Sequence, residues 1–293
     1  MKVAVAGASG LIGTALVEAL RADGHDVLQL VRRAPQHNGE VRWDPDEALN
    51  PLKLDGVDAA VCLSGAGVGD KRWSESYKRT LAESRINPTH TLASALAALD
   101  PKPRVFLSGS AIGYYGETGD TAIDETAGPG DDFLARLTVD WEAAAAPAEA
   151  AGIRVAYLRT GLVVAREGGA WGRMFPIFRL GLGGKLGNGR QYWSFISLSD
   201  HVRALQFLLT HEVSGPVNMT GPEPVTNAEV TKAMGKVLHR PTILPAPKFG
   251  LKIVLGEFAV DPLRSQRVLP NALQKAGFTF EHPTIEAAIR AAR

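Results

Sequence analysis

The chain has 293 residues, enough for one large α/β domain or two modest ones. Apolar residues make up 45% of it and charged residues 22%, which excludes disordered, collagen-like and coiled-coil proteins. Lys and Arg number 32 against 31 Asp and Glu, so a net charge of +1 gives no overall field to hold a nucleic acid or an anionic membrane.

Cysteine content and the start of the chain indicate a cellular compartment. Cys62 is the single cysteine, which excludes an intrachain disulfide and a cysteine metal cluster and is typical of the reducing cytosol. The chain opens on a strand-like run without a charged leader, and no apolar stretch approaches the roughly 20 residues that span a bilayer. We therefore expect a cytoplasmic protein with no membrane partner.

Short apolar runs alternate with longer amphipathic stretches over the first 160 residues. The runs predict strands at Val3–Ala6, Val27–Val31, Ala59–Leu63, Val105–Ser108 and Val155–Leu158. Helices are predicted from Leu11 to Leu20 with Gly24 as a stop signal, from Ser74 to Leu99 with an interruption at Pro88, and from Asp132 to Ala151 with Pro147 near the end. This alternation predicts a Rossmann-type α/β fold, a doubly wound and mostly parallel sheet with helices on both faces.

The pattern changes after residue 160. Residues Gly168–Gly189 hold eight glycines in 22 positions, too many for the interior of a helix or strand. A helix is predicted at Val202–Leu209 and a strand at Pro216–Met219, and recurring prolines from Pro241 onward predict a smaller, partly helical C-terminal subdomain. We assign residues 1–225 to a nucleotide-binding domain, with residues 160–200 on its substrate side, and residues 240–293 to the small domain.

A glycine-rich turn follows the first predicted strand and opens the first helix. Glycines at positions 7, 10 and 13 allow a sharp turn, close approach of backbone to a diphosphate, and close packing of helix on sheet. The free N–H groups and positive dipole end of the helix would then hold the phosphates. The predicted cofactor-binding residues of this turn are Gly7, Ser9, Gly10, Leu11, Ile12 and Gly13.

The end of the second strand indicates which dinucleotide is bound. An NAD enzyme often has an acidic residue there, whereas this chain has Arg32 and Arg33. Two guanidinium groups would attract the 2′-phosphate of NADP and offer it bidentate hydrogen bonds. The sequence therefore predicts NADP(H), although two ordinary surface arginines would give the same pattern.

Several further segments resemble a known family. Ser64-Gly65-Ala66, Ser108-Gly109-Ser110, Gly113-Tyr114-Tyr115-Gly116 and Phe195-Ile196-Ser197 occur in the order found in extended short-chain dehydrogenase/reductases, the NAD-dependent epimerases and dehydratases. Asp140-Trp141-Glu142, Arg159-Thr160-Gly161 and the C-terminal stretch resemble more narrowly the atypical "epimerase family protein" subgroup with its small C-terminal domain. The resemblance implies that Ser64, Gly65, Ala66 and Ser108 also bind the cofactor, and that a flanking helix pair supports a homodimer.

The resemblance also shows what is missing. The superfamily moves a proton with Tyr-x-x-x-Lys on one helix, and none of the five tyrosines here is followed by lysine at that spacing. Ser110 stands where relatives place a substrate-binding serine, and Tyr114 and Tyr115 follow it, so these three are the candidate catalytic residues. Two alternatives stay open: the tyrosines only wall the pocket, or Arg85 or Lys71 supplies the missing cation.

The substrate side is predicted from charge and aromatic content. Residues 168–199 carry four cations and no acid, which predicts a segment that closes over an anionic substrate or the cofactor, or else a mobile surface loop. Tyr192, Trp193 and Phe195 predict an aromatic wall, and Asp200 is expected to cap the following helix. The expected partner is thus a small molecule, anionic or aromatic in character.

Other classes of site find no support in the sequence. The seven histidines show no ligand-like spacing, no G-x-S-x-G elbow is present, and no nucleic-acid recognition motif appears. We therefore expect no metal and no nucleic acid. Two functions are carried forward: an NADP(H)-dependent oxidoreductase or epimerase acting on a small molecule, and a non-catalytic protein that binds or senses NADPH.

Overall fold

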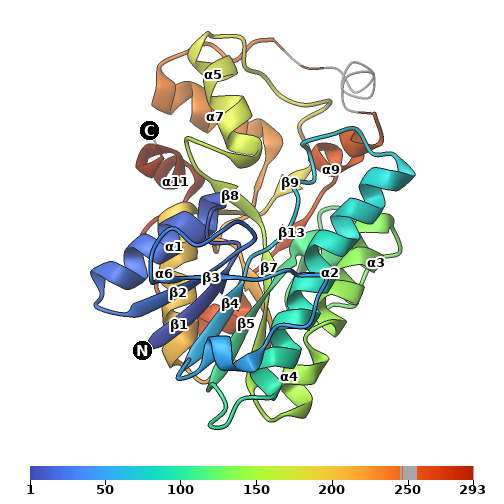
Figure 1. The fold of residues 1–293 in the computed structure, drawn as a ribbon. Coiled ribbons are helices and arrows are strands. Elements are labelled where there is room, and N and C mark those ends of the chain that lie inside the picture. Colours follow the sequence, from blue (N-terminus) through green and yellow to red (C-terminus); the bar gives the residue numbers. More distant parts are fainter. Residues whose placement is uncertain (245, 247–255, 293) are drawn as a thin grey trace.

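A seven-stranded parallel sheet forms the centre of the protein in a computed structural model that describes all residues except 245, 247–255 and 293 (Figure 1). The order of the strands is β11-β7-β5-β4-β1-β2-β3. Their bounds are β1 (Lys2–Ala6), β2 (Asp26–Val31), β3 (Glu40–Arg42), β4 (Ala59–Cys62), β5 (Val105–Ala111), β7 (Arg154–Thr160) and β11 (Gly215–Met219). The order of the strands reverses at β1, because β2 and β3 lie on one side of it and β4 and the later strands lie on the other. Sheets of this kind bind ligands at such a switch point, here between β1 and β4. The predicted Rossmann-type fold is confirmed.

Helices cover both faces of the sheet (Figure 1). One face packs against α1 (Leu11–Ala22) and α6 (Leu198–Thr210), and the other against α2 (Glu75–Ala97), α3 (Phe133–Ala143) and α4 (Ala146–Ala150). Alternate strand residues enter two separate apolar cores, which is why the strands read as continuous apolar runs.

A third core lies beyond the carboxyl ends of the strands. It joins α5 (Gly169–Arg179), α7 (Asn227–Leu238) and α11 (Ile285–Ala291) with the short strands β8 (Leu162–Val164) and β10 (Phe195–Ser197). C-terminal residues also return to the main sheet, because Leu273 and Phe278 enter the core under α1 and α6. The remaining elements are β6 (Ala122–Ile123), β9 (Tyr192–Trp193), β12 (Val225–Thr226), β13 (Arg267–Val268), α9 (Val260–Leu263), α10 (Asn271–Lys275) and the 3₁₀ turns η1 (Pro51–Leu54), η2 (Ile112–Tyr115) and η3 (Gly256–Ala259).

Three predicted helical features differ from the structure. α2 runs through Pro88 without a break, because its buried face, which includes Leu92 and Leu96, offsets one lost hydrogen bond. The stretch predicted from residue 132 to 151 is two helices, since Pro147 has no N–H to continue the first and lies in the first turn of the second, where proline is favoured. Part of the glycine-rich segment forms α5, where Trp171, Phe175 and Phe178 recur at helical spacing and are buried.

No helix in the described part of the chain is long and apolar enough to cross a membrane.

Candidate functional site

The turn between β1 and α1 holds glycines that a larger residue cannot replace without moving the backbone. Gly7 has a φ of 78°, and a Cβ there would lie 2.6 Å from the carbonyl carbon of Leu63. A Cβ on Gly13 would overlap the carbonyl oxygen of Gly7 and lie 2.9 Å from the Cα of Ala8. The Gly10 N–H closes the turn by donating to the Gly7 carbonyl at 3.1 Å. The start of α1 is therefore held directly against the end of β1.

The amino-terminal end of α1 is open to an anion. Its N-cap is Gly10, which has no side chain to accept from the first turn, and that turn contains no acidic residue. Ser9 and Gly10 are exposed, and Leu11 and Ile12 are partly buried. Backbone N–H groups and the positive end of the helix dipole favour a phosphate at such a place.

The other predicted cofactor residues follow neighbouring strands. Because β1 lies between β2 and β4, Gly7, Arg32 and Ser64–Ala66 emerge at one edge of the sheet. Ser64–Ala66 are partly or fully exposed there. Ser108 lies within β5 and is fully buried, so it supports this edge from inside the sheet.

Arg33 is engaged by a carboxylate of its own loop. Its guanidinium donates to both oxygens of Glu40 at 2.5 and 2.7 Å, and the Glu40 side chain is only 2% exposed. The hydrogen bonds from Arg33 and from the Gln36 N–H lower the pKa of Glu40 to about 2. Among the described residues, the Arg32 guanidinium has no hydrogen bond or ion pair. Of the two predicted arginines, Arg33 is therefore bonded to Glu40, and Arg32 is the one whose guanidinium can bind a ligand.

A buried ion pair lies beside Ser110 at the carboxyl end of β5. Ser110 is paired with Arg159 across β5 and β7, and Glu142 of α3 reaches both. Ser110 Oγ donates to Glu142 Oε1 at 2.6 Å, and Arg159 Nε and Nη2 donate to the two Glu142 oxygens at 2.8 and 2.9 Å. The side chains of Arg159 and Glu142 are 4% and 12% exposed. The three polar groups therefore form a fixed unit, largely closed to bulk water.

Both tyrosines of η2 contact Arg159. The Tyr115 hydroxyl accepts from Arg159 Nη1 at 2.9 Å and donates to Asn218 Oδ1 at 2.7 Å. Burial raises the pKa of Tyr115 to about 12, in spite of the adjacent guanidinium. Tyr114 is partly exposed, and its ring centroid lies 3.4 Å from Arg159 Cζ. The Tyr115 hydroxyl is thus used by hydrogen bonds inside the protein, whereas the Tyr114 side chain is partly exposed to solvent.

The first half of α3, the helix expected to carry the tyrosine–lysine pair, presents apolar and small side chains next to Tyr114. A Cβ on Gly113, next to Tyr114, would lie 3.5 Å from Leu134 Cβ and 3.8 Å from Thr138 Oγ1. Leu134 packs with Leu81 in a small apolar cluster between α2 and α3. Leu134 and Thr138, four residues apart on this helix, therefore present no ionisable group to Gly113 and its neighbour Tyr114.

The cation next to the tyrosines is Arg159, which we did not predict. Arg85 lies elsewhere and donates to the Ala66 carbonyl at 2.8 Å, and Lys71 lies 5.8 Å from the ring of Tyr77. A charged residue that directly follows the apolar strand residues 155–158 was the available sequence signal for Arg159. For Glu142 the sequence offers no signal beyond its place in the resembling segment Asp140-Trp141-Glu142.

The glycine-rich segment reaches the glycine turn. A Cβ on Gly168 would lie 3.6 Å from the side chain of Leu11, so the segment begins over the start of α1. Arg173 of α5 pairs with Asp70 at 3.2 Å, in the loop after β4. Lys185 lies apart from both, so the four predicted cations do not gather at one point.

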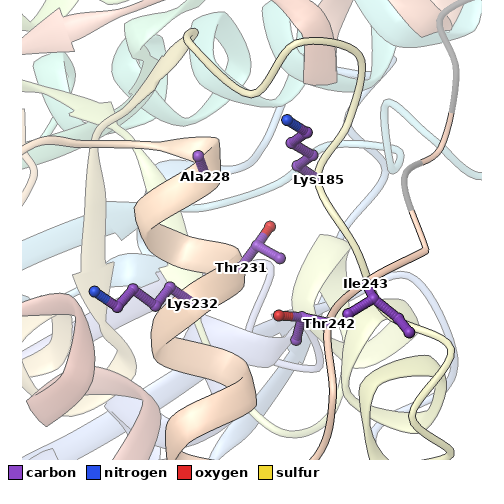
Figure 2. Close-up of a pocket in the computed structure, with 6 residues that line it drawn as sticks. All are labelled: Lys185, Ala228, Thr231, Lys232, Thr242 and Ile243. Carbon is purple, nitrogen blue, oxygen red and sulfur yellow. The ribbon is translucent and has the colours of Figure 1, made fainter.

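Lys185 lines a pocket of about 300 Å³ beside α7 (Figure 2). Figure 2 shows the amino groups of Lys185 and Lys232 well separated from each other. The pocket is lined by Lys185, Ala228, Thr231, Lys232, Thr242 and Ile243. None of these residues belongs to the glycine turn or to the Ser110 group, so we do not include the pocket in the candidate active site.

The predicted aromatic wall was wrong for two of its three members. Trp193 is 6% exposed and Phe195 is 1% exposed, and both belong to the third core. They are buried because β9 and β10 pass between the packed helices of that core. Tyr192 is partly exposed, with Arg267 Cζ 4.9 Å from its ring centroid.

Asp200 anchors the C-terminal segment and is not the cap of α6. The cap is Ser197, whose Oγ accepts from the Asp200 N–H at 3.0 Å. The buried Asp200 carboxylate accepts from the backbone N–H groups of Glu281 and His282 at 2.9 and 2.8 Å, and pairs with Arg203 at 2.8 Å. Asp200, Glu281 and His282 lie close enough together to hold a metal ion, but these bonds already use both Asp200 oxygens.

A buried histidine next to the site predicts a loss of stability in acid. His201 is fully buried, with Nε2 3.2 Å from Thr160 Oγ1 and Nδ1 unpartnered among the described residues. Burial lowers its pKa from 6.5 to about 4. In the unfolded chain this histidine binds a proton as the pH falls through about 6.5, whereas in the folded chain it binds one only near pH 4. Between these two pH values the unfolded state binds more protons, so the free energy of unfolding falls by up to about 3 kcal/mol as the pH is lowered.

Urea unfolding between about pH 7.5 and about pH 4.5 measures this effect. His201→Gln should flatten the pH dependence of the unfolding free energy, whereas the exposed His90→Gln should leave it unchanged. A His201→Gln protein with the slope of the wild type would contradict the assignment.

Nearly the whole chain is similar to known families and proteins. Residues 3–220 match the NAD dependent epimerase/dehydratase family, and residues 246–292 match a domain of unknown function, DUF1731. The chain is 49% identical to Epimerase family protein MT2273 of Mycobacterium tuberculosis, over 98% of this chain and 96% of that protein. It is 35% identical to human Epimerase family protein SDR39U1, with 99% of each chain covered.

Solved structures extend the comparison. Human epimerase family protein SDR39U1 (isoform 2) with NADPH superposes with a TM-score of 0.91 at 32% identity, over 100% of this chain and 99% of that one. A structure described as the nucleoside-diphosphate sugar epimerase from Corynebacterium glutamicum gives a TM-score of 0.81 at 36% identity, over 99% of this chain and 57% of that one. Sheet order and glycine turn together define a Rossmann-type α/β protein. The chain belongs to the NAD dependent epimerase/dehydratase family, and the predicted resemblance to the epimerase family proteins within it is confirmed.

Proposed function

We propose that this protein is an NADP(H)-dependent enzyme that oxidises, reduces or epimerises a small molecule at a carbon bearing a hydroxyl or carbonyl group. The observation that carries the proposal is the turn between β1 and α1, where Gly13 has no room for a Cβ and the first turn of α1 is uncapped. The human relative SDR39U1, whose structure contains NADPH, supports it.

The residues at the strand ends fit a dinucleotide. The first turn of α1 would hold the diphosphate, and Arg32, free of protein partners among the described residues, would meet a phosphate on the adenosine half. Ser64–Ala66 would border the bound dinucleotide, as the family resemblance implies. When bound, the nicotinamide accepts or supplies hydride, and the chain's own residues must therefore handle the proton.

Ser110 is the group we propose for the substrate oxygen and for the proton. Its hydroxyl hydrogen is donated to Glu142, so a lone pair of Oγ is left to accept from a substrate hydroxyl. As that hydroxyl gives its proton to Ser110, the serine proton passes to Glu142, and in the reducing direction both protons return. Arg159 holds Glu142 in place, and Tyr115 in turn holds Arg159. Tyr114 stays a second candidate, since its hydroxyl lies on a partly exposed side chain.

A non-catalytic NADPH-binding or sensor protein is the alternative, and one observation favours it. Leu134 and Thr138 have the four-residue spacing of the tyrosine–lysine pair on the helix where the resemblance places it, and Leu134 is packed into an apolar cluster. A chain that had lost its chemistry but kept its cofactor would show this combination. The cytoplasmic location and a homodimer stay predictions for either function.

Turnover of NADPH separates the two functions. We expect the wild type to oxidise NADPH with at least one member of a panel of aldehydes, ketones, quinones and keto sugars, followed by NADPH absorbance. Ser110→Ala should lower that rate by about 100-fold without changing the affinity for NADPH. Ser94→Ala, at an exposed position on α2, is the matched control. Binding of NADPH with no turnover of any panel member would favour the sensor, and failure to bind NADPH would reject both.

A further inference from the structure

Arg42 ends a strand that we did not predict, next to the glycine turn. β3 pairs in parallel with β2, and Arg42 lies opposite Val31 in the register. β2 in turn pairs with β1, whose last residue precedes Gly7. Arg32 and Arg42 therefore leave neighbouring strand ends at the same edge of the sheet as the proposed diphosphate site.

A pocket of about 360 Å³ opens between these strand ends. Three of its lining residues are cations, Arg32, Arg42 and Lys53, and two are acids, Asp44 and Glu47, which leaves an excess of positive charge. In the part of the chain that the structure describes, neither arginine side chain has a hydrogen bond or ion pair, and both belong to this one pocket. Lys53 Nζ donates to the Arg42 carbonyl at 3.1 Å, which brings a third positive charge alongside.

Arg33 is not available to the same pocket. Nη1 and Nη2 of its guanidinium both donate to the Glu40 carboxylate, which is shielded from solvent and also accepts from the Gln36 N–H. A phosphate that drew Arg33 away would leave the shielded Glu40 carboxylate without its guanidinium partner, with only the Gln36 N–H and the His37 ring beside it, which is unfavourable. Arg33 therefore shapes the loop after β2.

We propose that the pocket between β2 and β3 binds a phosphomonoester dianion through Arg32 and Arg42, and that Arg42 takes the role that the sequence suggested for Arg33. This inference rests on the proposed function, in which the dianion is the 2′-phosphate of NADP(H). Two guanidinium groups from adjacent strands offer forked donors to two sides of a phosphate. NADH has an uncharged hydroxyl at that position, so the same contacts discriminate against it.

Adenosine 2′,5′-bisphosphate and adenosine 5′-monophosphate are the probes, because they differ only in the 2′-phosphate and need no turnover. By titration calorimetry, Arg42→Ala should raise the Kd for the bisphosphate at least about tenfold and change that for the monophosphate less than about twofold. Arg42→Lys should restore part of the loss, and added salt should shrink the difference. Arg21→Ala is the matched control, since Arg21 is exposed in the last turn of α1, at the opposite end of the sheet.

The outcomes separate this inference from the proposed function. If the wild type prefers the bisphosphate and Arg42→Ala keeps that preference, the role of Arg42 is overturned while NADP(H) binding stands. If Arg33→Ala alone removes the preference in a protein that melts like the wild type, the assignment is likewise overturned. If the wild type binds neither NADPH nor the bisphosphate, both proposals fail. Thermal melts of each variant, with Arg42→Gln as a second replacement of similar length, exclude a folding defect as the cause.

Discussion

Replacement of Gly13 by alanine is expected to abolish NADPH binding and to destabilise the protein by at least about 2 kcal/mol. The new Cβ would overlap the Gly7 carbonyl oxygen and crowd the Ala8 backbone, and neither can move without breaking the contact of α1 with β1. The first turn of α1 would then move away from the end of β1, and the site that we propose for the diphosphate lies between these two elements. Fluorescence titration with NADPH and urea unfolding measure the two effects.

Gly10→Ala separates cofactor binding from folding. A Cβ on Gly10 meets only the Gly7 carbonyl oxygen, at 3.4 Å, so the fold should tolerate it, but the methyl group would stand at the exposed, uncapped end of α1. We expect weakened NADPH binding with a nearly unchanged unfolding free energy. Gly128→Ala, which meets nothing within 4 Å, is the control for both glycine variants. A Gly13→Ala protein that binds NADPH like the wild type would contradict the role given to the turn.

The glycine turn was predictable because all its determinants are local. Strand, glycine spacing and amphipathic helix lie within the first 22 residues, and each glycine answers a steric requirement of that turn alone. Apolar runs similarly predict six of the seven strands of the sheet, including β11 at Pro216–Met219. β3 was missed because it has only three residues, one of them a buried glutamate, and carries no apolar run.

The centre of the candidate site was not predictable in the same way. Glu142 and Arg159 lie on a helix and a strand 17 positions apart, and neither residue type nor spacing indicates that they meet. The partnership of Arg33 with Glu40 also depends on a loop conformation and the short β3. Arg32 and Arg33 are adjacent and look equivalent in the sequence. In the structure Arg33 is paired with Glu40, whereas Arg32 lines a pocket.

Glycine count alone misled the prediction for residues 168–189. Two of the glycines, Gly168 and Gly169, stand at the start of α5 with positive φ, where glycine is favoured, and the rest mostly follow the helix. The apolar spacing of Trp171, Phe175 and Phe178 between them was the stronger signal. Position of glycines relative to a periodic pattern therefore matters more than their density.

Breaking the Glu142–Arg159 pair is expected to have the second large effect. Burial of Arg159 opposes its charge, but the hydrogen bonds and charge of Glu142, with the Tyr115 hydroxyl, outweigh it and raise the pKa of Arg159. Glu142→Leu would leave that cation 4% exposed and unpaired, at an expected cost of about 3 to 5 kcal/mol in unfolding free energy. Urea unfolding measures the loss. Asp70→Asn, in an ion pair whose side chains are 58% and 62% exposed, should cost less than about 1 kcal/mol.

The double variant Glu142→Leu/Arg159→Met tests whether the cost comes from the unpaired charge. Without either charge the site becomes apolar, so most of the stability should return, and the coupling energy of the cycle should be large. Turnover should not return, because Ser110 would have lost the carboxylate that takes its proton. A single Glu142→Leu variant as stable as the wild type would contradict the buried pair. A double variant that recovers both stability and turnover would show that the Glu142–Arg159 pair has only a structural role. It would also exclude Glu142 from the proposed proton path.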